Sequence, residues 1–83
     1  MISTVLQIGE LIKTARKRIG FTQQLAAGYA GVGTRFLSDL ENGKSTVQLD
    51  LTLKVLKSNG FNVYIVPRTN VKLIQYIEDN LNG

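Results

Sequence analysis

The sequence turns a sharp corner near its middle, where a single valine stands between two glycines at residues 31–33. Glycine has no Cβ and adopts the positive φ that a short turn needs. Helix-forming patterns lie on both sides, so this corner predicts two short helices joined by a tight turn. The second helix, over about residues 34–41, would then stand clear of the body. Asn42 and Gly43 form a turn signal that ends it.

The first helix is expected over residues 4–19, where apolar residues recur at three- and four-residue intervals. Thr4 and Gln7 match a capping box, in which each side chain bonds the backbone N–H of the other residue. Gly20 can supply the left-handed residue that often ends a helix. The sequence therefore predicts an amphipathic helix with one apolar stripe.

A second helix is expected from its N-cap residue Thr22 to Ala30. The small residues at 26–28 predict a face for close contact with another helix. In the third helix, Leu37 and Leu40 are expected to face the core together with Phe36, because they share one side of the helix.

The fourth helix is expected to open at Ser45, which forms a second capping-box match with Gln48. Its apolar residues fall on more than one side, so we expect it to be well buried. Residues 61–66 (FNVYIV) are typical of a strand. A strand needs ladder partners, either the N-terminal MISTVL run or, as we prefer, a second molecule. Apolar spacing within residues 69–83 predicts a short amphipathic C-terminal helix of the same domain.

Composition limits the function of this 83-residue chain, which is small enough to be one domain. It contains neither cysteine nor histidine, which excludes disulfides, thiolate metal sites and the commonest general base. We therefore expect no enzyme activity, no catalytic residues, no metal and no cofactor. Residues 1–68 carry nine basic and four acidic side chains. This balance favours a polyanion such as nucleic acid or an anionic membrane surface, although it also serves solubility alone.

Two features bear on location. The N-terminus lacks a basic start followed by a long apolar core, so it does not match a secretory signal. The most apolar run, VYIV at 63–66, is too short to span a bilayer. We expect a soluble, cytoplasmic protein.

The residues around the glycine corner at 31–33 resemble those of a known protein family. Residues 8–56 resemble the Xre/Cro-type helix-turn-helix repressor domain, and FLSDLENGK, the leucine-rich fourth helix and the following strand are most similar to HipB-type antitoxins. The matching residues are Arg16, 20–23 (GFTQ), Ala27, 31–32 (GV), 36–38 (FLS) and 40–44 (LENGK). The resemblance implies a mainly α, lambda-repressor-like fold of four to five helices with a C-terminal β-strand that pairs across a dimer. The helix-turn-helix domain with this strand would occupy residues 1–68.

The outward side of the third helix is the predicted base-reading surface. Arg35 can grip guanine O6 and N7 through two hydrogen bonds, and the alternative is a solvated or phosphate-bound arginine. Thr34 and Ser38 carry hydroxyls that suit a base edge or a phosphate. Asp39 could accept from a cytosine amino group, or it could simply contribute helix polarity.

Phosphate contacts are expected on either side of that helix. The resemblance implies that Gln23, at the positive end of the second helix, contacts the DNA backbone. Thr22 is assigned beside it, although its simpler role is the helix cap. Asn42 and Lys44 resemble the family's phosphate-binding pair, and the alternative is ordinary turn chemistry. Such contacts position a protein on DNA without choosing the sequence.

Two further assignments are structural. Arg16 and Glu41 resemble the family's internal ion pair, which ties the first helix to the end of the third. The dimerisation residues are expected in the strand, although Phe61, Val63 and Ile65 could instead belong to the core. The dimer assignment comprises Phe61, Val63, Tyr64 and Ile65.

These features predict a dimeric, sequence-specific repressor that binds an inverted-repeat operator in double-stranded DNA. The HipB resemblance implies an antitoxin that represses its own operon and binds a HipA-like serine/threonine kinase toxin. Two alternatives remain. The chain could be a protein-interaction module that sequesters a partner without binding DNA, or a plain Xre-type regulator with no toxin.

Overall fold

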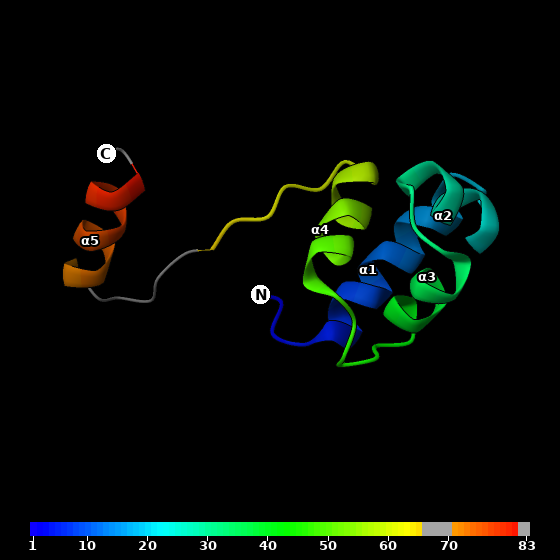
Figure 1. Cartoon of the computed structure of the whole chain (residues 1–83), viewed down its shortest axis with the longest axis horizontal. Helices are drawn as coiled ribbons and strands as arrows, with labels where there is room; N and C mark the ends of the chain where they lie inside the picture. The colour runs from blue at the N-terminus through cyan, green and yellow to red at the C-terminus, as the bar shows by residue number, and fades with distance from the viewer. Residues whose placement is uncertain (66–70, 82–83) are drawn as a thin grey trace.

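The chain folds into helices. The structure, a computed structural model, describes residues 1–65 and 71–81 and has five helices within them (Figure 1). They are α1 Val5–Arg18, α2 Gln23–Ala30, α3 Thr34–Glu41, α4 Leu49–Ser58 and α5 Val71–Leu81. Figure 1 shows α1 to α4 packed into one body and α5 apart from it. The mainly α fold expected from the sequence is confirmed.

Local signals set the start and end of α1. The Thr4 side chain accepts a hydrogen bond from the Gln7 backbone N–H at 3.2 Å, and Gln7 Oε1 accepts from the Thr4 N–H at 3.1 Å. The predicted capping box is therefore present. Past the other end, Gly20 has a φ of 75°, a conformation that glycine adopts without strain.

The core forms where the first four helices meet. Ile12, Leu37, Leu40 and Val55 are its largest fully buried side chains, one from α1, two from α3 and one from α4. Phe36 is partly buried and packs against this cluster. Since α3 contributes two of the four, its inward side is anchored while its outward side stays free.

Two glycines behave differently from what their positions suggest. Gly28 of α2 is exposed, and a Cβ there would meet nothing within 4 Å, so the predicted close-contact face is wrong at this residue. Gly9 of α1 is buried instead. A Cβ on Gly9 would clash with the carbonyl oxygens of Leu40 and Glu41. The close approach therefore lies between α1 and the end of α3.

The predicted start of α4 is also wrong. The helix begins at Leu49 after Gln48, which makes no side-chain cap bond. Ser45 lies in a turn in which the Val47 N–H donates to the Lys44 carbonyl at 3.3 Å. That turn lets Val47 pack against the core, and the helix can begin only after it.

Nor is α4 buried all round. Leu49 and Leu53 are 70% and 41% exposed. One apolar side of α4 is therefore left for another contact.

Residues 61–65 form no strand within the described part of the chain, so the predicted strand is not made by one copy alone. Phe61 is tied to α4 by its N–H, which donates to the Leu56 carbonyl at 3.0 Å. The side chains that follow stand in solvent, with Tyr64 80% and Ile65 92% exposed. A ladder needs a partner, and the partner that we expected is a second molecule. Val66, the last residue of the predicted strand, lies outside the described residues.

The predicted C-terminal helix is present as α5. Its Tyr76 and Leu81 are 65% and 79% exposed. Among the described residues, no helix has the length and apolar character needed to cross a membrane.

Candidate nucleic-acid interface

The corner at residues 31–33 is built from backbone geometry. Gly31 ends α2 in the left-handed conformation, with φ 74° and ψ 34°. The Val32 N–H donates to the Ala27 carbonyl at 3.0 Å, and the partly buried Val32 side chain packs against the core. Gly33 then serves as the N-cap of α3 with φ −72° and ψ 148°. One residue between two glycines is thus enough to redirect the chain from α2 into α3.

A lysine from α4 braces the same corner. The Lys54 ammonium donates to the Gly31 carbonyl at 3.2 Å. This carbonyl lies at the C-terminal end of α2, where the helix dipole favours a positive charge. This contact could not be predicted from the sequence, because nothing in the local pattern around Lys54 distinguishes it from a solvated lysine.

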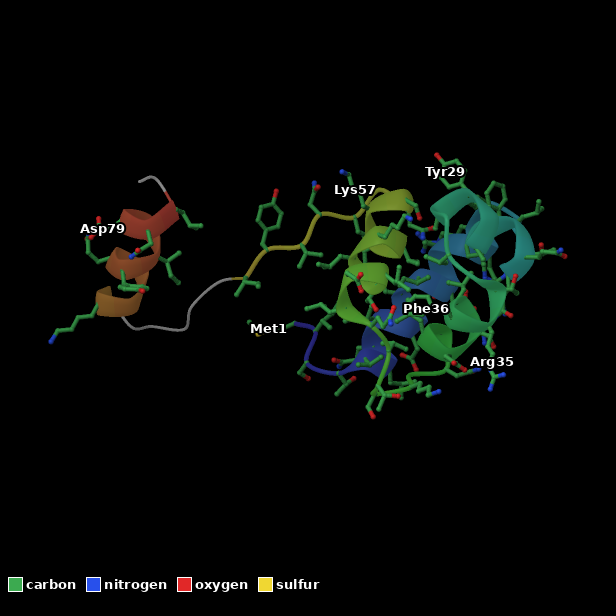
Figure 2. All side chains as sticks on the ribbon, in the orientation of Figure 1. Met1, Tyr29, Arg35, Phe36, Lys57 and Asp79 are labelled. Atoms are coloured by element: carbon green, nitrogen blue, oxygen red, sulfur yellow. The ribbon has the colours of Figure 1, made fainter. Side chains whose placement is uncertain are left out.

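The outward side of α3 carries the predicted base-reading residues. Thr34 and Arg35 are exposed, while Ser38 and Asp39 are half-buried. Arg35 extends from α3 away from the body (Figure 2). Because Leu37 is 1% exposed on the inward side, the helix is fixed by its core contacts and presents the polar residues to solvent.

The end of α3 brings two of the predicted contact residues together. The Lys44 ammonium lies 3.6 Å from the Asp39 carboxylate, and both side chains are partly exposed. This pair places Lys44 beside the outward side of α3 and neutralises part of the carboxylate charge there. Asn42, the C-cap of α3, is exposed in the same turn.

The two predicted phosphate contacts on α2 are placed differently from each other. Thr22 caps the helix, because its Oγ1 accepts from the Leu25 N–H at 3.1 Å. Its hydroxyl hydrogen takes no part in this bond. Gln23 is half-buried, and its Nε2 donates to Glu41 Oε1 at 3.1 Å. One side-chain N–H of Gln23 is thus turned toward α3.

Arg16 and Glu41 lie together inside the body. Arg16 Nε is 2.7 Å from Glu41 Oε2, and Arg16 Nη2 is 2.9 Å from Oε1. The third group of the guanidinium, Nη1, donates to the Phe21 carbonyl at 2.8 Å. The two residues are 8% and 4% exposed. With Gln23, this cluster joins α1, α2 and α3.

Both charges are stabilised by this geometry. Burial raises the pKa of Glu41, but the hydrogen bonds from Arg16 and Gln23 outweigh it and hold the pKa below its usual 4.5. The hydrogen bond to Glu41 raises the pKa of Arg16 further. The ion pair is therefore fully charged at neutral pH.

The arrangement suits a surface that meets a polyanion. The Gln23–Glu41 bond sets the start of α2 beside the end of α3, and the Asp39–Lys44 pair adds the following turn. A helix N-terminus, an exposed arginine and a lysine are each groups that bind phosphate or base edges. In residues 1–65 and 71–81, no group of acidic side chains could hold a metal ion.

The sequence that forms this surface matches a known protein family. The model for the helix-turn-helix family, HTH_3, matches residues 12–60. The chain belongs to this helix-turn-helix family. The resemblance stated from the sequence is confirmed, since the match spans the cluster, the corner and α3.

One relative is similar to this chain over most of its length. An uncharacterized HTH-type transcriptional regulator, y4mF, of Sinorhizobium fredii is 43% identical over 65 residues. The match covers 78% of this chain and 86% of the relative.

Solved structures share the fold. The chain is similar to one in a HipB–O4 20mer complex, with a TM-score of 0.71 over 81% of this chain and 94% of that one. It is also similar to a chain in the structure of a HipA–HipB–O2–O3 complex, with a TM-score of 0.72 over 84% and 97%. At 24% identity in both cases, this similarity establishes the fold alone.

Proposed function

We propose that the protein is a sequence-specific, DNA-binding transcriptional repressor. The observation that carries this proposal is the outward side of α3, where Thr34 and Arg35 stand exposed beyond the glycine corner while Leu37 anchors the opposite side. The family match and the regulator name of the S. fredii relative support it.

Geometry determines how such a helix would be used. The major groove of B-DNA is about 12 Å wide and admits one α-helix. With α3 in the groove, Arg35 would donate two hydrogen bonds to guanine, and Thr34 and Ser38 would lie against base edges or phosphates. Asp39 would accept a hydrogen bond from a cytosine amino group. Lys44 would then leave the Asp39 carboxylate and bind a phosphate.

Flanking groups would fix the register. The start of α2 presents backbone N–H groups and the hydroxyl of Thr22, which suit a phosphate. Asn42 and Lys44 would bind the backbone on the other side of α3. Gln23 would act through its backbone N–H and the free part of its amide, because its other N–H is bonded to Glu41.

We further propose that the protein acts as a homodimer. Val63, Tyr64 and Ile65 are more than half exposed in the single chain, and antiparallel pairing of this segment with a second copy would bury them and satisfy their backbone groups. Phe61 would anchor the pair from the core side. A two-fold dimer places two recognition helices about 34 Å apart, so the operator would be an inverted repeat.

The similarity to HipB structures supports a narrower role. One of those structures holds HipB together with HipA. We propose that this protein is the antitoxin of a HipA/HipB-like operon, that it represses this operon in the cytoplasm, and that it binds a kinase toxin whose enzymatic activity belongs to the toxin.

The test is a gel shift with duplex DNA from upstream of the protein's own gene. A specific complex is expected, with an affinity that falls steeply as salt rises, because bound counterions are released from the phosphates. A shuffled duplex of the same composition is the matched control. Equal affinity for both duplexes, or no complex, would reject the proposal. Co-purification with a kinase in that case would instead favour a protein-interaction module.

A further inference from the structure

The C-terminal helix carries two large apolar side chains that are exposed in the described part of the chain. Tyr76 and Leu81 are 65% and 79% exposed. A helix shorter than about 12–15 residues is marginal in water without packing, and α5 has 11 residues. The helix therefore needs a surface against which to fold.

The body offers an open apolar groove of about 430 Å³. Its lining includes Ile8 and Leu11 of α1, Leu56 of α4 and the segment that starts at Phe61. Leu11 and Val63 on its edge are 36% and 53% exposed. A groove lined by leucine, isoleucine and valine side chains suits the apolar side of a short helix.

Strand geometry indicates which copy of the groove α5 reaches. If residues 61–65 pair antiparallel about Val63, Ile65 of one chain lies opposite residue 61 of the second copy, with Cα atoms about 4.5–5.5 Å apart. Phe61 lines the groove. The end of the paired segment, at Ile65 of one chain, therefore lies beside the groove of the other copy.

The short connection between residue 65 and α5 keeps α5 close to the groove of the second copy. Five residues separate Ile65 from Val71, so the two Cα atoms are six steps apart and at most about 22 Å from each other. Tyr64 and Ile65 line the groove of their own chain as well, but the segment 61–65 runs away from the body (Figure 1). Continuing in that direction carries α5 over the second copy, whereas packing against its own groove needs the chain to turn back within those five residues. Opposite charge adds to this, since α5 carries Glu78 and Asp79 and the body is basic.

We infer that the two copies exchange their C-terminal helices, so that α5 of each packs into the groove of the other. This inference rests on the homodimer of the proposed function. The exchanged helices would cover the apolar side chains next to the paired segments and lock the dimer. The occupant of the groove is a second copy of this chain.

Paramagnetic relaxation enhancement on the full-length chain tests the exchange. The chain has no cysteine, so a Gln75→Cys variant carries one nitroxide label, on an exposed residue of α5. Labelled chains without ¹⁵N are mixed with unlabelled ¹⁵N chains. We expect broadening of the Leu11 and Leu56 amide signals in the ¹⁵N chain. A label at Gln24→Cys, on an exposed residue of α2, is the control and should leave both signals sharp.

A second sample carries label and ¹⁵N on the same chain, diluted with unlabelled wild type. Broadening confined to this sample would place α5 on its own body and overturn the inference, as would no broadening of these signals in either sample. Sedimentation of the unlabelled protein separates the two failures. If the protein sediments as a monomer, the proposed homodimer is rejected. If it sediments as a dimer but shows no broadening between chains, only the helix exchange is rejected.

A substitution provides an independent check. Leu81→Asp should raise the dimer dissociation constant about tenfold or more, because burying an aspartate in place of a leucine removes favourable contact area. Lys72→Gln, at an exposed position on the same helix, should change it far less. Equal constants for Leu81→Asp and wild type would overturn the inference.

Discussion

At the scale of single residues, the carboxylate of Glu41 joins three helices. It accepts from Arg16 of α1 at 2.7 Å and from Gln23 of α2 at 3.1 Å while belonging to α3 itself. Both members of the ion pair are buried, so neither charge has water as a substitute partner. Removal of one charge would leave the other uncompensated in the interior.

Glu41→Gln is therefore expected to lower the free energy of unfolding by about 3–5 kcal/mol, the usual effect of breaking a buried ion pair. Urea denaturation followed by circular dichroism measures it. Glu10→Gln, on an exposed residue of α1, is the control and should stay within about 0.5 kcal/mol of wild type. A similar small change for Glu41→Gln would mean that the pair contributes little.

The same carboxylate predicts a dependence on pH. The pKa of Glu41 in the folded protein lies below its usual 4.5, so the unfolded chain takes up the proton first as pH falls. Its contribution to stability is present above pH 4.5 and is lost as pH drops through the folded pKa. The stability difference between wild type and Glu41→Gln should shrink below pH 4.5 in urea titrations. A difference that stays constant down to acid pH would contradict the stabilising ion pair.

Arg35 is the residue that we propose reads the base sequence. Arg35→Ala should weaken binding to the preferred operator by about 1–3 kcal/mol and relax the base preference at one position in each half-site. Competition gel shifts with single-base variants measure this. Arg18→Ala removes an exposed arginine from α1 and should leave the preference intact. If Arg35→Ala retains the full preference, Arg35 is not a reader.

At the scale of helices, two glycines in helix interiors should respond in opposite ways to the same substitution. Gly28→Ala should stabilise the protein by up to about 1 kcal/mol, because α2 gains a better helix former in open space. Gly9→Ala should destabilise it by about 1–3 kcal/mol, since a Cβ would push α1 off the end of α3. Thermal denaturation compares the two directly. A Gly9→Ala variant as stable as Gly28→Ala would contradict the close approach.

The helices that were predicted well are those set by local signals. Thr4 and Thr22 cap α1 and α2, and Gly31 redirects the chain, all within a few residues of the elements that they define. Gly9 could not be predicted, because its role depends on the packing of α3 from more than thirty residues away. Ser45 matched a cap pattern by spacing alone, and the turn before α4 overrode it.

Only part of the candidate surface could be predicted from the sequence. Arg35 follows a recognisable corner, and the structure places it in solvent. The inward bond of Gln23 and the Lys54 brace at Gly31 arise from tertiary contacts between helices. Neither leaves a local pattern. Residues 61–65 form no strand in the described chain, and the pairing that we propose for them would be a property of two molecules.

At the scale of the whole molecule, three consecutive exposed apolar side chains, Val63, Tyr64 and Ile65, lie in the segment that we propose pairs with a second copy. Ile65 is 92% exposed in the single chain, so Ile65→Asp should leave the body folded while shifting dimer to monomer. Operator affinity should fall with it, because two recognition helices are no longer linked. Sedimentation equilibrium and gel shifts measure both. Ile19→Asp, which alters another apolar residue that is 60% exposed, is the control and should remain dimeric.

Selection of bound sites from random duplexes shows whether the outward side of α3 reads DNA sequence. We expect enrichment of an inverted repeat whose half-sites are centred about 34 Å, one turn of DNA, apart. The same selection with Arg35→Ala should return the same spacing with one base position in each half-site relaxed. A wild-type selection that enriches no sequence would show that the outward side of α3 does not read DNA.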